Sequence, residues 1–437
     1  MPLKKNLSLY GLIMVAIGSC IGSGIFLVPS QIASHLPSPD LIILVWALGG
    51  LITLTGALTF AELAGLFPKA GGVYVYLKEA YGDLAGFLYG WAYLTVVNTG
   101  AIAALCIGFT YYLGFIIPMT DTQKTITALV AIIGTGVINI FGVKIGEYFS
   151  NFFTGIKILG ILAVIAAGLF LGNVSLPELA PSNFSTPDNL STAFGLALVG
   201  VLWSYGGWQH TSYLSGEARN ASRNIPMAMI FGALVVTLIY LATNFAYMFM
   251  LPIEQMVSSE RVAADAISTI FPAGGTMVAA LIAVSTLGTA GIYTLTAPRI
   301  YYAMAADGIF YKKLAEIHPK YGTPVNAILL QSVWAGIILI IYETFEKIVI
   351  YVVFTDWIFF TLAGISIFIY RRKLKDQTRP YKTLLYPITP IIFVVISGGF
   401  VINTLVEKPA QAWAGLSLLV LGLPFYFLYK RFSKKDQ

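Results

Sequence analysis

Charge is scarce in this 437-residue sequence: charged residues make up 11% and hydrophobic residues 57%. A soluble domain has about 25% charged residues, and the mean hydropathy of +0.81 is far too high for one. These values exclude a soluble globular protein and predict a polytopic all-α membrane protein. Because a membrane-spanning helix needs about 20 residues, the chain has room for about twelve spans in one transmembrane domain over residues 1–437 and none for a soluble domain.

Cysteine and histidine are also rare. The two cysteines, Cys20 and Cys106, lie in apolar runs rather than in loops, so neither a disulfide framework nor a metal site is indicated. The histidines at 35, 210 and 318 lie in different segments, and no paired carboxylates or Ser-His-Asp neighbourhood is evident. A membrane enzyme therefore has little support, and no cofactor is indicated. A signalling receptor is disfavoured by the lack of soluble domains.

Twelve apolar runs separated by loops are the predicted spans. They cover residues 9–34, 40–66, 83–117, 123–143, 147–172, 191–215, 227–251, 273–304, 325–342, 348–370, 384–406 and 411–429. Residues 70–81 form an amphipathic segment that we expect at the membrane interface. An even number of spans places both termini on one side of the membrane.

The positive charges orient the chain. If both termini are cytoplasmic, few of the 26 lysines and arginines lie on the extracellular side of the membrane. Those outside are Lys124, Arg261, Lys347 and Lys408. This bias predicts a multi-pass cell-membrane protein with both termini in the cytoplasm. It also explains the net charge of +6 without any nucleic-acid partner.

The first span contains Gly-Ser-Gly at 22–24, near mid-depth in the membrane. Glycine weakens a helix, so we expect the helix to unwind there and to restart at about Ile25. Unpaired backbone at this depth is tolerated only inside protein or beside a polar cavity, and the free N–H groups of a restarting helix suit a carboxylate. The alternative is a helix-packing face, because Gly18 and Gly22 stand four residues apart.

The sixth span carries a second irregularity, Trp-Ser-Tyr-Gly-Gly-Trp-Gln at 203–209. The first and sixth spans hold equivalent positions in two five-span halves, at about 9–172 and 191–372, with two extra helices at 384–431. Matching glycine-interrupted spans are typical of transporters built as inverted repeats, where the central site binds anionic and cationic groups of one ligand. A zwitterion fits such a site.

Two ionisable residues lie deep within predicted spans. Lys157 is about ten residues into the fifth span, too deep to reach either surface easily. Two kinds of acceptor could hold its ammonium as a fixed charge: the hydroxyls of Ser285, Thr286 and Thr289, and the carbonyls freed near residue 18. Alternatively, Lys157 could lose and regain its proton during transport. Asp356 in the tenth span is either a proton relay or a hydrogen-bonded structural carboxylate, and Glu62 is expected at the interface.

Several motifs occur together in order. They are Gly-Ser-Gly-Ile-Phe at 22–26, Tyr-Gly-Gly-Trp at 205–208, Glu-Ala-Arg-Asn at 217–220, Arg-Asn-Ile-Pro at 223–226, Ser-Thr-Leu-Gly at 285–288, Ala-Asp-Gly at 306–308, Pro324 and Arg-Pro-Tyr-Lys at 379–382. With them the chain resembles, over nearly its whole length, the amino acid, polyamine and organocation (APC) transporters, within the branch of L-type amino acid transporters and their bacterial relatives. The resemblance implies a fold of five plus five inverted spans, two extra spans, and alternating access.

The resemblance also implies residue roles. The substrate carboxylate would meet backbone N–H groups around Ser23, Gly24 and Ile25, and its ammonium would meet carbonyls of Cys20, Trp203 and Gly206. Trp203 would close over the substrate as an outer gate, where the branch usually has phenylalanine. Lys157 would fill the position of a sodium ion, and Tyr240 would act near the inner gate unless it is only a core aromatic.

The loop at 117–122 departs from the mammalian members of the branch. Those members carry a cysteine there that links them to a glycoprotein heavy subunit, whereas this loop has none. We therefore expect no disulfide-linked partner. The sequence predicts a sodium-independent exchanger of small neutral L-amino acids, with a proton-coupled symporter using Lys157 or Asp356 as the alternative.

Overall fold

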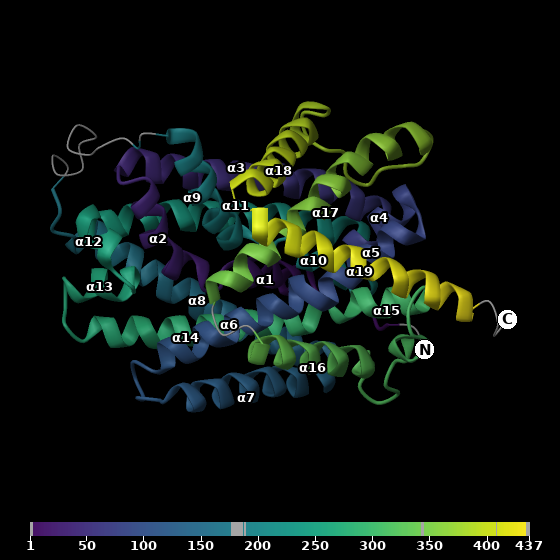
Figure 1. Cartoon of the computed structure of the whole chain (residues 1–437), viewed down its shortest axis with the longest axis horizontal. Helices are drawn as coiled ribbons and strands as arrows, with labels where there is room; N and C mark the ends of the chain where they lie inside the picture. Colours follow the sequence, from purple (N-terminus) through teal and green to yellow (C-terminus); the bar gives the residue numbers. More distant parts are fainter. Residues whose placement is uncertain (1–2, 176–186, 188, 342–344, 408, 434–437) are drawn as a thin grey trace.

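The computed structural model describes residues 3–175, 187, 189–341, 345–407 and 409–433, and the named elements of this part of the chain are all helices joined by loops (Figure 1). Its helices are α1 (Leu9–Cys20), α2 (Gly24–His35), α3 (Pro39–Leu66), α4 (Val73–Tyr81), α5 (Asp83–Ala92), the π-helix η1 (Tyr93–Val97), α6 (Asn98–Leu113), α7 (Asp121–Ile140), α8 (Val143–Leu171), α9 (Leu190–Tyr205), α10 (His210–Tyr213), η4 (Leu214–Gly216), α11 (Ala221–Met250), α12 (Ile253–Ser258), α13 (Val262–Ser268), α14 (Gly274–Thr296), α15 (Pro298–Ala306), η5 (Lys312–Ala315), α16 (Val325–Ile341), α17 (Phe345–Lys373), α18 (Ile388–Glu407) and α19 (Pro409–Ser433).

One to three consecutive helices occupy each of the twelve predicted spans. Ten are long and apolar enough to cross a membrane by themselves, and α9 with the segment His210–Gly216 forms an eleventh that is bent by 42°. The remaining span corresponds to α16, which is apolar but only 17 residues long. Lys408, Lys434 and Lys435, three of the charges used for orientation, lie outside the described residues. The division into inverted halves stays a prediction.

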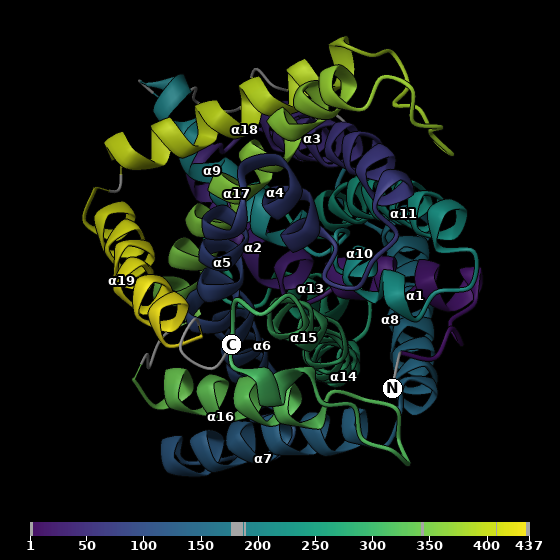
Figure 2. The ribbon, with the colours of Figure 1, turned by 90° about the vertical axis from the view of Figure 1, so that its right-hand side faces the viewer.

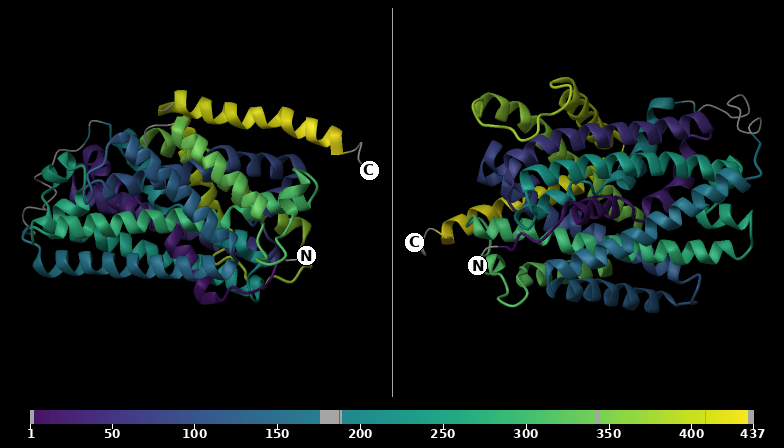
Figure 3. Two further views of the ribbon diagram at one scale, coloured as in Figure 1. Left: turned by 90° about the horizontal axis from the view of Figure 1, so that it is seen from below. Right: turned by 180° about the vertical axis from the view of Figure 1, so that it is seen from behind.

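The broken first span lies at the centre of the bundle. In its most apolar window 89% of residues are buried, against 22% for the last span. Helix α1 packs against α8, α11 and α14, and α2 packs against α9. Figures 2 and 3 show α7, α16, α18 and α19 at the periphery. Unwound backbone in a membrane is tolerated only where protein or a polar cavity surrounds it, which explains this central position.

The first and last described residues lie at the same end of the molecule, together with α4 and α15 (Figure 1). Helix α4 lies where an interfacial segment is expected, but its residues 73–77 are buried in protein. The Tyr370 hydroxyl of α17 donates a 2.5 Å hydrogen bond to the Tyr76 carbonyl. The apolar face of this segment therefore packs against the bundle.

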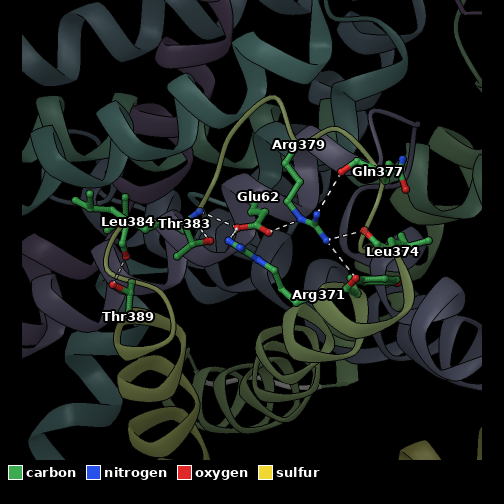
Figure 4. A network of polar contacts seen from close by, with 10 residues as sticks. Glu62, Arg371, Leu374, Gln377, Arg379, Thr383, Leu384 and Thr389 are labelled. Atoms are coloured by element: carbon green, nitrogen blue, oxygen red, sulfur yellow. Dashed lines mark hydrogen bonds and ion pairs between the residues drawn. The ribbon is translucent and has the colours of Figure 1, made fainter.

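Glu62 of α3 is fully buried within the protein at this end of the molecule, and its expected depth near the membrane interface stays a prediction. Its carboxylate lies 2.7 Å from an Arg371 nitrogen and 3.1 Å from the Arg379 Nε, and it accepts a 2.7 Å hydrogen bond from the Thr383 backbone N–H (Figure 4). The carboxylate thus ties α3 to the end of α17 and to the loop that follows.

Replacing Glu62 with glutamine should lower stability by about 3 kcal/mol, because removing one partner of a buried ion pair leaves the other charges uncompensated. The apparent melting temperature of the purified protein in detergent measures the effect. Glu79→Gln is the matched control, since Glu79 is half-exposed and 3.8 Å from Lys69. Equal melting temperatures for the two variants would contradict a stabilising role for Glu62.

Candidate functional site

The first span is interrupted where the sequence predicts. Helix α1 ends at Cys20 and α2 begins at Gly24, so residues 21–23 are unwound. The backbone N–H groups of Ser23, Gly24 and Ile25 make no hydrogen bond to other described residues. The Ser23 hydroxyl is buried and likewise has no partner in the described chain. This first break therefore presents a cluster of unpaired donors at a helix N-terminus, as an anion site requires.

Lys157 of α8 reaches the opposite side of the first break. Its side chain is fully buried, and its Nζ lies 2.9 Å from the Gly18 carbonyl oxygen and in hydrogen-bond contact with the Thr289 hydroxyl. Among the described ion pairs none includes Lys157. The side-chain nitrogen is therefore surrounded by carbonyl and hydroxyl oxygens, which are the ligands that a bound monovalent cation would have.

Helix α14 supplies two hydroxyls to the same carbonyls. The Thr289 hydroxyl lies 3.0 Å from the Gly18 carbonyl and 2.9 Å from that of Ile21, and the Ser285 hydroxyl lies 3.3 Å from the Ile21 carbonyl. Thr286 differs, because its hydroxyl bonds carbonyls of its own helix at 282 and 283. Of the three hydroxyls predicted beside Lys157, those of Ser285 and Thr289 therefore form hydrogen bonds to the first break, and that of Thr286 does not.

The second break separates α9, which ends at Tyr205, from α10, which begins at His210. Gly207 adopts φ +123°, and a Cβ there would lie 2.5 Å from the Ser19 carbonyl oxygen. The Ser19 hydroxyl donates a 2.8 Å hydrogen bond to the Gly207 carbonyl. Only glycine fits this approach, so the two breaks are packed directly against each other.

Tyr240 of α11 contacts both breaks. Its hydroxyl lies 2.8 Å from the Cys20 carbonyl oxygen and 2.9 Å from that of Ser204, and the ring is fully buried. One phenolic proton can be donated to either carbonyl. Tyr240 therefore bridges the two broken helices, in addition to packing in the core.

A small cavity lies beside the second break. Trp203 and Gly206 line it, together with Asp356 of α17 and Asn98 of α6. Water centres can occupy about 30 Å³ of it, which is room for about two water molecules. Residues 20–25 do not line this cavity: at Gly24 a Cβ would lie 2.4 Å from the Ser204 Oγ, so the first break is covered by α9.

The third span contains a feature that sequence reasoning missed. Residues 93–97 form the π-helix η1, which interrupts the span just before Asn98. A π-turn inserts one extra residue and is frequent at functional sites. Here it places Tyr93 and Asn98 at the cavity. The only sequence signal was Asn98 itself, a polar residue in the middle of an apolar run.

The described residues contain no group of three or more histidine, cysteine, aspartate or glutamate side chains that could hold a metal ion. Cys20 and Cys106 are both buried free thiols. His210 lines the cavity, where its Nδ1 lies 2.6 Å from the Thr296 hydroxyl and its ring stacks on Tyr293. The polar groups of this site thus suit binding of an organic ligand by hydrogen bonds.

Comparison with known proteins agrees with this arrangement. The chain is 32% identical to the serine/threonine exchanger SteT of Bacillus subtilis (98% of each chain). It is 32% identical to the human b(0,+)-type amino acid transporter 1 (99% of this chain, 89% of that one). It is 28% identical to the human Asc-type amino acid transporter 1 (98% and 82%). A family model for amino acid permeases matches residues 7–424. The chain therefore belongs to the amino acid permease family of the APC superfamily.

Proposed function

We propose that this protein is a sodium-independent exchanger of small neutral L-amino acids that works by alternating access in the cell membrane. The observation that carries the proposal is the pair of broken helices packed against each other, one with free N–H groups and the other beside a cavity that Asn98 and Asp356 line. The names of the relatives support it, since they include a serine/threonine exchanger and an Asc-type amino acid transporter.

In this proposal the backbone recognises the parts common to all amino acids. The carboxylate binds the N–H groups of residues 23–25 with help from the Ser23 hydroxyl. The ammonium binds the carbonyls of Cys20, Trp203 and Gly206. The Cys20 carbonyl already accepts from the Tyr240 hydroxyl and from the Gly22 N–H, so Tyr240 must turn to the Ser204 carbonyl, its other acceptor, before Cys20 can accept from the substrate. The Trp203 carbonyl accepts from the Gly206 N–H.

Alternating access requires the cavity and the first break to become one space. Because the cavity now holds only about two waters, its walls must separate before an amino acid enters. We assign the outer gate to Trp203, which is half-buried at the cavity wall. We assign a role in inner gating to Tyr240, which contacts both breaks.

Sodium independence follows from Lys157. A protonated lysine among the carbonyls and hydroxyls of the first break supplies the positive charge that a sodium ion would supply there. We further propose that both termini are cytoplasmic, as the distribution of lysine and arginine indicates, and that the chain works without a disulfide-linked subunit.

The test is uptake of radiolabelled alanine into proteoliposomes that contain only this protein. Vesicles preloaded with unlabelled alanine are compared with empty vesicles, with and without sodium and an inward proton gradient. We expect uptake only into preloaded vesicles and no effect of either ion. Uptake without any second protein would also dispose of an enzyme or receptor function.

A proton-coupled symporter is the second candidate, and Asp356 is the observation that favours it. Asp356 is a buried carboxylate beside the cavity and forms none of the described ion pairs. Intramembrane carboxylates are frequent proton carriers. Accumulation in empty vesicles driven by an inward proton gradient would establish this function and refute the exchanger.

Ser23→Ala should raise the KM for alanine about threefold to tenfold, with a smaller change in the maximal rate. The variant removes one neutral hydrogen bond to the carboxylate, worth about 0.5–1.5 kcal/mol, and leaves the backbone donors in place. Concentration-dependent exchange into preloaded proteoliposomes measures it. Ser34→Ala, at the exposed end of α2, is the matched control. An unchanged KM in Ser23→Ala would remove this hydroxyl from the binding site.

A further inference from the structure

The cavity beside Trp203 has one wall with unpaired polar groups. Asn98 is 1% exposed, and neither its amide oxygen nor its amide nitrogen has a hydrogen-bond partner among the described residues. A buried amide without partners costs free energy of about 1–3 kcal/mol. Such groups are rare in native proteins and need an explanation. Asn98 lines the cavity, so its partners are the waters that fit there in the closed cavity and a group of the ligand that replaces them when the cavity opens.

Asp356 of α17 lines the same cavity and is 9% exposed. One of its oxygens accepts a 2.9 Å hydrogen bond from the Tyr93 hydroxyl, and no described ion pair involves Asp356. The Tyr93 hydroxyl is held in turn by Gln209, whose Nε2 lies 3.3 Å away, and by the Tyr213 hydroxyl at 2.8 Å. The carboxylate is therefore oriented by its neighbours and has capacity to accept a further hydrogen bond.

The two groups come from different spans that meet only in the folded protein. The π-helix η1 sets the position of Asn98, whose N–H bonds the Tyr93 carbonyl. The other lining side chains are largely apolar and include Leu202, Val352 and Phe360. The polar side chains of Tyr93, Gln209 and His210 also line the cavity, but each already makes a hydrogen bond within the protein. The unpaired amide and the carboxylate can therefore form a selective site, since few polar groups fix the orientation of a ligand.

We propose that Asn98 and Asp356 form a subsite for the substrate side chain, and that it selects a side-chain hydroxyl. A hydroxyl can donate its one proton to Asp356 and accept from the Asn98 amide nitrogen, so each of the two residues gains a hydrogen bond and only the amide oxygen stays unpaired. An ammonium could donate to Asp356 and to the amide oxygen, but it cannot accept from the amide nitrogen, so the experiment below compares the two groups directly. A methyl group would satisfy neither. The inference rests on the proposed function, because it assumes that an amino acid enters this cavity.

Threonine and valine provide the test, because they have nearly the same shape and differ in a hydroxyl against a methyl group. The ratio of kcat/KM for threonine over valine is measured by exchange into preloaded proteoliposomes. A site built to bind a hydroxyl rejects the analogue that lacks it, so we expect a ratio of about 100 in the wild type. Because both rates come from one preparation, the ratio does not depend on the amount of active protein.

Asp356→Leu should reduce this ratio to about 1 or below, since leucine has a similar shape and cannot accept a hydrogen bond. Asp356→Asn keeps an acceptor and should reduce the ratio about tenfold; it serves as the second variant if the leucine variant does not fold. Asn98→Leu should also lower the ratio. Asp121→Asn is the matched control, because the Asp121 side chain is 99% exposed, and its ratio should equal that of the wild type.

The outcomes separate the two proposals. If the wild type exchanges no amino acid, the proposed function is wrong. If it exchanges alanine but the ratio is near 1, or the ratio is unchanged in Asp356→Leu and Asp356→Asn, the subsite is wrong and the exchanger stands. Ornithine is included as a third substrate. A wild type that prefers ornithine to threonine, and loses this preference in Asp356→Leu, would overturn the hydroxyl assignment in favour of an ammonium.

Discussion

Lys157→Ala should reduce exchange to about 1% of the wild-type rate or less while the protein stays folded. The ammonium lies 2.9 Å from the Gly18 carbonyl and contacts Thr289, so it connects α8, α1 and α14 at the first break. Without the ammonium, the buried carbonyls at the first break have no cation beside them, and the unwound segment loses its position. Exchange of radiolabelled alanine into preloaded proteoliposomes measures the effect, and gel filtration in detergent reports folding.

Two further variants separate charge from packing. Lys157→Met keeps most of the apolar side-chain stem, which packs in the core, and removes the ammonium, so it should be as inactive as Lys157→Ala. Lys144→Ala is the matched control, because Lys144 lies on the same helix and is exposed; it should exchange at the wild-type rate. Near-normal exchange by Lys157→Met would show that the lysine serves packing and that its proposed role as a fixed cation is wrong.

The sequence was sufficient to predict the fold class and both broken spans. Glycine pairs in the middle of long apolar runs are a local signal, and the break at residues 21–23 lies within one residue of the predicted 22–24. The contact between Lys157 and the Gly18 carbonyl was also anticipated, since a lysine at that depth needs acceptors. These predictions succeed because each depends on one segment and on the cost of burying polar groups in a membrane.

The cavity could not be predicted in the same way. The π-helix η1 has no composition that distinguishes it from an ordinary helix, so the position of Asn98 was not foreseen. Asp356 was recognised as unusual, but which face of α17 meets the second break depends on packing between distant spans. For Thr286 the sequence predicted a contact that the structure does not show. Its place beside Ser285 suggested contact with the first break, whereas its hydroxyl forms hydrogen bonds to carbonyls of its own helix.

The same limit applies to segments outside the spans. The amphipathic pattern at 70–81 identified a helix with one apolar face, but it could not say whether lipid or protein covers that face. In the structure protein covers it, as the bond from Tyr370 to Tyr76 shows. Glu62 was likewise assigned by its depth alone, while the two arginines that pair with it come from the end of α17 and the loop after it, more than 300 residues later in the chain. Periodicity therefore predicts elements, whereas partners require the fold.

Gly24→Val should have the second large effect, a loss of exchange of about 100-fold or more and well beyond that of Ser23→Ala. A Cβ at Gly24 would lie 2.4 Å from the Ser204 Oγ and 2.7 Å from the Ser204 Cα. The second of these atoms belongs to the backbone of α9, so a side-chain rotation cannot relieve the clash. The branched side chain would also lie beside the N–H groups that we assign to the substrate carboxylate.

Gly134→Val on α7 is the matched control, because a Cβ at Gly134 would meet no atom within 4 Å. Its exchange rate should stay near that of the wild type, although valine is β-branched in both variants. Alanine at position 24 adds only the Cβ and should fall between the wild type and Gly24→Val. If Gly24→Val folds and exchanges as fast as Gly134→Val, then α2 and α9 separate freely at this point, and the carboxylate site must lie elsewhere than at the start of α2.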